Sequence, residues 1–183
     1  MIIMMGLPGA GKSTVLSEVL KQKPEYKALN YGTLMFDIAK EKYGIENRDQ
    51  IRTLDAKQQK TVQAEVGKRL AKEKGKVILD THCSILNPAK KFYLPGLPYS
   101  LLKDIHVDML ILLTGDIDEL AQRRANDPSR QRAVDKSEIA SHDSHNRMLL
   151  ACYSALSGAP AKIILNRNGK VDEAVAEFVS VME

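Results

Sequence analysis

The first segment of the chain carries the pattern that most restricts its fold. In "MIIMMGLPGAGKSTVL", Gly6 is followed by four residues and then by Gly11, Lys12 and Ser13. Apolar residues precede the glycines, as in a buried strand, and the apolar residues after Ser13 recur at the spacing of an amphipathic helix. A strand, a glycine loop and a helix in this order predict a phosphate-binding loop, in which backbone N–H groups and a helix N-terminus surround an anion.

Two side chains of this loop have predicted roles of their own. Lys12 is expected to reach the outer phosphates of a nucleotide, and the Ser13 hydroxyl to bind the Mg²⁺ that accompanies them. A glycine turn that merely joins a strand to a helix is the alternative. The combination of strand, glycines, Lys, Ser and helix in register favours the phosphate-binding loop.

Length and composition indicate an ordinary globular protein. The chain has 183 residues, of which 44% are hydrophobic and 27% charged, which fits a single domain over residues 1–183. We expect neither a membrane anchor nor a signal peptide, because no apolar run is long enough to span a bilayer and the N-terminal apolar run is the first strand. Cys83 and Cys152 are too few for a disulfide framework, so we expect reduced thiols and a cytoplasmic location.

The formal net charge of +4 is compatible with a polyanionic partner. It is weak evidence for nucleic acid, because the same basic residues can gather around the phosphates of a nucleotide. The basic run at 68–76 is explained more simply as the solvated face of a helix. We therefore do not expect nucleic acid as a partner.

Strand-like and helix-like segments alternate along the chain, which predicts an α/β fold with a parallel sheet covered on both faces. Five strands are expected, at 2–5, 26–32, 76–82, 107–113 and 161–166. Helices are expected at 13–21, 33–43 and 55–74, and two more are expected to begin at carboxylate caps, Asp116 with Glu119 and Asp135 with Glu138. The polar, arginine-bearing segment between these last two helices is predicted to be a mobile loop.

Ligands of such sheets bind beyond the carboxyl ends of the strands, where the polar residues after each strand meet. Asp80 ends a buried strand, where a protein with a phosphate-binding loop needs a carboxylate to orient the water shell of Mg²⁺. The alternative is an Asp that only caps a turn.

Arginines are the most discriminating signal in the second half of the chain. Guanidinium groups suit phosphoryl oxygens, and a loop that closes over a triphosphate would carry them. Arg124 is expected on the surface, on a different helical face from its neighbour. The arginines expected at phosphates are Arg123, Arg130, Arg132 and Arg147.

Arg48 and Arg52 form a second basic pair, about one helical turn apart, so both can face one anion. The alternative is that they make surface ion pairs with Asp49 and Asp55. An alcohol acceptor usually needs a carboxylate base, whereas a phosphate, with a second pKa of about 6, arrives largely ionised. Because the only rival base, Asp37, is expected to face solvent, the chain favours a phosphate as acceptor.

Taken in order, several segments resemble those of the archaeal-type adenylate kinases: "GLPGAGKST", "NYGTLMFDIA", "NRDQIRTLDAKQQK", "LDTH", "YLPGLP", "RRANDPSRQR" and "NRNG". The resemblance implies a P-loop kinase fold, a three-layer α/β sandwich with a five-stranded parallel sheet. It further implies an AMP-binding arm at about 33–60, a short lid at about 126–136, a homotrimer, and the reaction of MgATP with AMP to give two ADP. Two departures are a slightly earlier start of the first strand and "AKKF" before "YLPGLP", where a glycine is more usual.

The resemblance also assigns roles to matching positions. Asp80 and Ser13 would serve Mg²⁺, while Lys12, Arg123, Arg130, Arg132 and Arg147 would be catalytic. ATP would be bound by Gly6, Leu7, Pro8, Gly9, Ala10, Gly11, Lys12, Ser13 and Thr14. AMP would be bound by Thr33, Arg48 and Arg52, and His82, next to the strand end, is a candidate to line the acceptor site. A kinase of another nucleoside monophosphate or of a small metabolite stays open as an alternative, as does, less favoured, a regulatory or RNA-associated ATPase.

Overall fold

A sheet of five parallel strands lies at the centre of the computed structural model, which describes residues 1–87, 92–126 and 134–182, without the side chains of Asp49 and Arg52. The strand order is β2-β3-β1-β6-β7. These strands are β1 (Ile2–Gly6), β2 (Lys27–Asn30), β3 (Val77–Asp80), β6 (Met109–Thr114) and β7 (Ala161–Leu165). The predicted five-stranded parallel sheet is confirmed.

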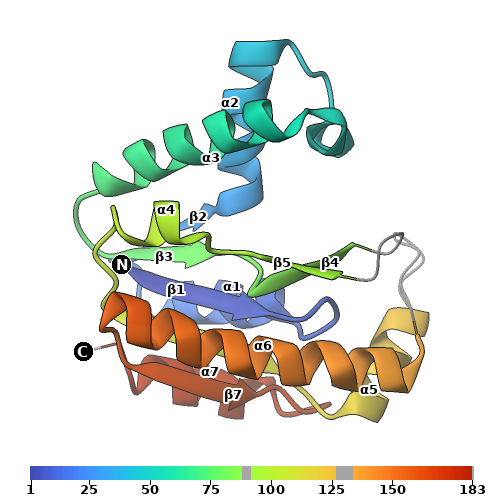
Figure 1. The fold of residues 1–183 in the computed structure, drawn as a ribbon. Coiled ribbons are helices and arrows are strands. Elements are labelled where there is room, and N and C mark those ends of the chain that lie inside the picture. Colours follow the sequence, from blue (N-terminus) through green and yellow to red (C-terminus); the bar gives the residue numbers. More distant parts are fainter. Residues whose placement is uncertain (88–91, 127–133, 183) are drawn as a thin grey trace.

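Helices cover both faces of this sheet, as Figure 1 shows. They are α1 (Lys12–Gln22), α2 (Tyr31–Tyr43), the 3-10 helix η1 (Arg48–Thr53), α3 (Ala56–Ala71), α4 (Tyr99–Leu102), α5 (Ile117–Ala125), α6 (Lys136–Ser157) and α7 (Val171–Val179). The strand β1 is buried throughout because its side chains alternate between two cores. Ile3 and Met5 pack in the core shared with α2, α3 and α6, whereas Ile2 and Met4 pack in the core shared with α1 and α7. The fold is therefore a three-layer α/β sandwich.

The segment α2–η1–α3, called the arm below, stands above the sheet on the side of β2 and β3 (Figure 1). The arm proposed for 33–60 falls within it. Its helices begin at strong caps, because the Asn30 side chain accepts a hydrogen bond from Thr33 N and Asp55 forms a capping box with Gln58.

The predicted helix starts in the second half of the chain are confirmed. Asp116 accepts from the backbone N–H groups of Asp118 and Glu119, and Asp135 accepts from that of Glu138. Most of the predicted lid at 126–136 lies outside the described residues. No helix in the described part of the chain is long and apolar enough to cross a bilayer.

Two expectations from the sequence were wrong in detail. The second strand ends at Asn30, and α2 begins at Tyr31, so Gly32 lies in the first turn of a helix and does not end the strand. The sequence predicts no regular element directly after β3, yet the chain there forms an antiparallel hairpin of β4 (Ser84–Asn87) and β5 (Phe92–Pro95).

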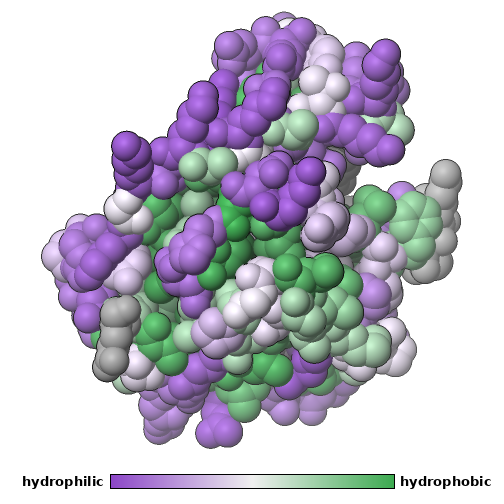
Figure 2. Space-filling model, turned by 60° about the vertical axis from the view of Figure 1, so that its left-hand side comes forward, coloured by the Kyte–Doolittle hydropathy of each residue, from purple (hydrophilic) through white to green (hydrophobic). Residues whose placement is uncertain are grey.

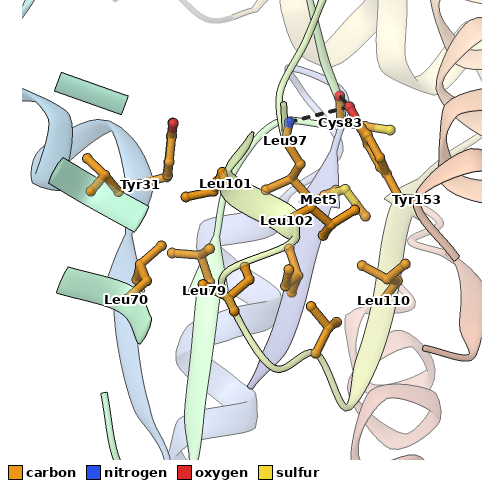
Figure 3. Close-up of a cluster of buried hydrophobic side chains, with 14 of the residues drawn as sticks. Met5, Tyr31, Leu70, Leu79, Cys83, Leu97, Leu101, Leu102, Leu110 and Tyr153 are labelled. Carbon is orange, nitrogen blue, oxygen red and sulfur yellow. Dashed lines mark hydrogen bonds between the residues drawn. The ribbon is translucent and has the colours of Figure 1, made fainter. Parts of the chain in front are cut away.

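A single hydroxyl closes the base of this hairpin. The buried Tyr153 of α6 donates to the carbonyl oxygen of Cys83 at 2.8 Å and accepts from the backbone N–H of Leu97 at 3.3 Å (Figure 3). Gly96 lies so close to the backbone of His82 that any side chain there would collide with the His82 carbonyl. The hairpin is thus held both to α6 and to the end of β3.

Replacing Tyr153 by Phe should destabilise the protein by about 1–3 kcal/mol, because it leaves the buried N–H of Leu97 without an acceptor. Urea unfolding measures the difference. Tyr99, which is 61% exposed, provides the control. Tyr99→Phe should change stability by less than about 0.5 kcal/mol, and equal effects of the two substitutions would contradict the role given to Tyr153.

Candidate active site

The phosphate-binding loop joins β1 to α1 in the strand–loop–helix arrangement that the sequence predicted. Gly9 and Gly11 both have positive φ, 88° and 81°, which favours glycine at these turns. The N-cap residue of α1, Gly11, has no side chain to bond the first N–H groups of the helix. These donors and the positive end of the helix dipole suit an anion.

Lys12 and Asp80 meet at the carboxyl ends of β1 and β3. Their charged groups are 2.9 Å apart, and each side chain is only 14% exposed. The other carboxylate oxygen of Asp80 accepts from the side-chain amide of Asn30 at 2.8 Å. The predicted phosphate-binding lysine and the predicted metal carboxylate therefore lie side by side.

Asn30 connects this pair to the arm, and the sequence analysis missed it. Its Oδ1 accepts hydrogen bonds from the N–H and the hydroxyl of Thr33 and from the guanidinium of Arg48, at 3.0, 3.2 and 3.2 Å. The Arg48 guanidinium occupies the space that a side chain on Gly32 would need. Two of the predicted acceptor residues, Thr33 and Arg48, are thus brought together. The Asn30 side chain connects both of them to Asp80. His82 follows β3 at the same strand end, and the side chain of Arg52 is not described.

Arg123 reaches the loop from α5. Its guanidinium donates to the carbonyl oxygen of Asn166 at 2.9 Å, to Asn168 Oδ1 at 2.8 Å and to Glu119 at 3.0 Å, and it lies 3.5 Å from the carbonyl oxygen of Gly9. It therefore sits between the phosphate-binding loop and the turn after β7.

Arg124 was expected on the surface, and this was wrong. It is only 7% exposed, its Nε donates to the carbonyl oxygen of Pro8 at 2.8 Å, and its side chain packs beside Gly9. Tertiary packing of α5 against the loop buries it, which helical position alone could not reveal.

The other arginines are less closely tied to the loop. Arg147 on α6 bonds to Asp143 at 2.7 Å, and Asp143 also accepts from the buried hydroxyl of Thr114. Arg147 and Asp143 line a pocket with Leu165 and Arg167 at the end of β7. Arg130 and Arg132 lie outside the described residues.

Asn166 is a second residue that the analysis of the sequence missed. It is 5% exposed, and its side-chain amide donates to the carbonyl oxygen of Ala10 at 2.9 Å. A side chain on Gly11 would collide with that amide. The polar segment after the last strand was noted as part of the rim, but its contact with the first loop could not be read from one sequence.

The donor set of this site fits a Mg²⁺ ion. Within the described residues no three His, Cys, Asp or Glu side chains gather into a metal site. Mg²⁺ needs no such cage, because it is usually held by one or two side chains together with substrate phosphates and water. Asp80 offers a buried oxygen, Oδ1, whose partner is the Lys12 ammonium, and Ser13 lies exposed at the start of α1.

Cys83 is the nearest thiol to the strand end, and it is not a nucleophile of the site. It is fully buried, and its thiol donates to the carbonyl oxygen of Asn146. Burial raises the pKa of this thiol to about 12, so it stays protonated at neutral pH.

Comparison with known proteins gives a consistent set of relatives. A family model described as an AAA domain matches residues 5–140. Curated relatives include the adenylate kinase of Methanopyrus kandleri, 43% identical over 186 residues, covering 99% of this chain and 96% of that protein. The adenylate kinase of Methanocaldococcus jannaschii is 39% identical over 189 residues, covering 100% and 97%. The shikimate kinase of Bacteroides thetaiotaomicron, at 13% identity and a TM-score of 0.58 over 98% of this chain and 96% of its own, shares the fold.

Replacing Asn166 by Ala should weaken binding of a nucleoside triphosphate about fivefold, the effect of one lost hydrogen bond that holds the phosphate-binding loop. Calorimetric titration with ATP measures it, well below the unfolding temperature. Lys170→Ala is the control, because the Lys170 ammonium lies beyond this loop and pairs with Glu173. Unchanged affinity in Asn166→Ala would show that the loop holds its shape without this contact.

Proposed function

This chain belongs to the archaeal-type adenylate kinases, whose reaction is reversible phosphoryl transfer from ATP to AMP giving two ADP, and we propose that its residues hold the two nucleotides on opposite sides of Asp80. The observation that carries this proposal is the position of Asp80 between Lys12 and Asn30. Lys12 belongs to the phosphate-binding loop, and Asn30 holds Thr33 and Arg48.

On the donor side, the residues Gly6 to Thr14 bind the ATP phosphates. Lys12 exchanges its contact with Asp80 for the outer phosphates, where its charge offsets theirs. Arg123 reaches the same loop, and Arg130 and Arg132 close over it from the lid. Closure excludes water, which would otherwise compete as acceptor.

Arg147 is proposed to join the other arginines at the ATP phosphates by giving up its ion pair with Asp143. The Arg147 guanidinium lies 2.7 Å from the Asp143 carboxylate, so its transfer to a phosphate oxygen exchanges one anionic partner for another.

Mg²⁺, held by Ser13 and Asp80, neutralises charge on the outer phosphates when it is bound. Asp80 already faces Lys12, so the release of that lysine to the phosphates frees a carboxylate oxygen on the same side.

On the acceptor side, Thr33, Arg48, Arg52 and His82 bind AMP. Arg48 supplies a bidentate donor next to the N-terminus of α2, and both features attract a phosphate. The phosphate of AMP arrives largely ionised, so no general base is required. The exposure of Asp37 agrees with this, because it leaves that carboxylate in solvent.

We also propose that three copies of the chain assemble in the cytoplasm. The free thiols of Cys83 and Cys152 suit a reducing compartment. Support for assembly comes from apolar side chains left exposed on α6 and on the edge strand β7. They are Met148 at 60%, Leu156 at 57%, Ile163 at 36% and Leu165 at 41%. Such a group of exposed apolar residues is typical of an interface.

Arg132→Ala and Arg123→Ala should each leave ATP binding largely intact and lower kcat at least about a hundredfold, the scale of losing one electrostatic contact to the transition state. A coupled assay that offers AMP, CMP and UMP in turn measures turnover and acceptor preference together, and AMP should be strongly preferred. Near-normal turnover in both variants would remove these arginines from the mechanism, and preference for another monophosphate would identify a different kinase.

Combining Met148→Glu with Ile163→Glu should shift the particle from the mass of three chains to that of one, because buried carboxylates without partners disfavour the interface. Light scattering after size exclusion reports the mass. Ile85→Glu, at a residue 51% exposed on the hairpin, is the matched control and should remain trimeric. A wild-type protein of single-chain mass would refute the assembly.

A further inference from the structure

The hydroxyl group of Tyr31 is buried and has no hydrogen-bond partner among the described residues. Tyr31 is the first residue of α2 and is 8% exposed, and its hydroxyl makes no hydrogen bond within the part of the chain that the structure describes. A buried polar group without a partner costs free energy, and proteins rarely retain one that has no role. A partner that arrives with a ligand would remove this cost.

Tyr153 provides the contrast. It is buried to a similar degree, at 3% exposed, and its hydroxyl makes two hydrogen bonds with the backbone. The fold therefore provides partners for a buried phenol where the phenol has a structural role, whereas the described residues provide none for Tyr31.

The direction of the Tyr31 side chain points to the ligand site. In Figure 3 its hydroxyl lies at the level of Leu97 and Cys83, beyond the carboxyl end of β3, whereas Leu79 and Leu70 lie at the opposite end of its ring. This is the edge of the sheet at which Lys12 and Asp80 meet. The hydroxyl is thus aimed at the rim.

The neighbours of Tyr31 indicate which part of a ligand it would meet. Asn30 and Thr33 lie on either side of it in sequence, and with Arg48 they form the cationic, hydrogen-bonding end of the acceptor site. The Tyr31 ring itself belongs to the apolar core cluster that includes Leu54 and Leu97. Apolar walls suit the flat face of a base, whereas each hydroxyl of a sugar would need a partner there.

We propose that the Tyr31 hydroxyl donates a hydrogen bond to the nucleobase of the acceptor nucleotide and so helps to select AMP. The proposal rests on the function given above and extends it to a residue outside the phosphate-binding set. Burial raises the pKa of Tyr31 to about 12, so the hydroxyl carries its proton across the working pH range. Tyr31 is therefore a donor to a ring nitrogen of adenine.

The test is the substitution Tyr31→Phe, which removes only the hydroxyl. KM for AMP should rise about five- to tenfold, the effect of one hydrogen bond, while KM for ATP stays unchanged. The loss should fall on KM more than on kcat, because the contact is made in both the ground state and the transition state. The melting temperature should stay the same or rise, because none of the described residues loses a hydrogen bond to this hydroxyl.

Tyr153→Phe is the matched control and should show the opposite pattern, a lower melting temperature with little change in KM for AMP. Calorimetry with ribose 5-phosphate tests the assignment to the base, since this ligand lacks one and should bind Tyr31→Phe and wild type equally. Unchanged KM for AMP in Tyr31→Phe would overturn the proposal, and so would an equal loss of affinity for ribose 5-phosphate and AMP. A wild-type enzyme that does not phosphorylate AMP would instead overturn the proposed function.

Discussion

The contact between Lys12 and Asp80 is the interaction on which the rest of the site depends. It joins the loop after β1 to the end of β3, and through Asn30 it extends to the arm. Both charged groups are largely removed from water, so neither can lose its partner without a replacement of opposite charge. In the proposed complex, a nucleotide with its metal would supply both replacements, phosphate for the lysine and cation for the carboxylate. The pair therefore fixes the relative positions of the phosphate-binding loop and the end of β3.

Side chains from α5 and from the turn after β7 fix the phosphate-binding loop in position. Asn166 and Arg124 each donate to a carbonyl oxygen of the phosphate-binding loop, which leaves the N–H groups of the loop for phosphate. Arg123 joins the same loop to the turn after β7. Donors that are already fixed in position need little reorganisation when charge develops in the transition state. Stabilisation of that charge by preorganised groups is the main source of catalysis in phosphoryl transfer. The acceptor side is built differently, on an arm that stands away from the sheet (Figure 1).

The sequence predicted those parts of the structure that local patterns determine. Unbroken apolar runs predict buried parallel strands, and Asp116 and Asp135 mark helix starts because a cap acts within one turn. The hairpin escaped notice because Ile85 and Leu94 are apolar yet exposed, so its short strands lack a clear alternation. Gly32 suggests a strand end in the sequence because glycine usually interrupts regular structure, yet it lies in α2. Its actual requirement is space for the Arg48 guanidinium, a contact between distant segments. The burial of Arg124 and the contact of Asn166 with Ala10 have the same tertiary origin.

A crystal structure with a bisubstrate dinucleotide, two adenosines joined by a chain of phosphates, tests the central claim most directly. The account predicts one adenosine on the side of the phosphate-binding loop and the other on the side of Arg48, with the Lys12 ammonium moved from Asp80 to a phosphate oxygen. It is contradicted if both adenosines lie on one side of Asp80, or if Lys12 keeps its contact with Asp80 while the Arg48 guanidinium faces solvent.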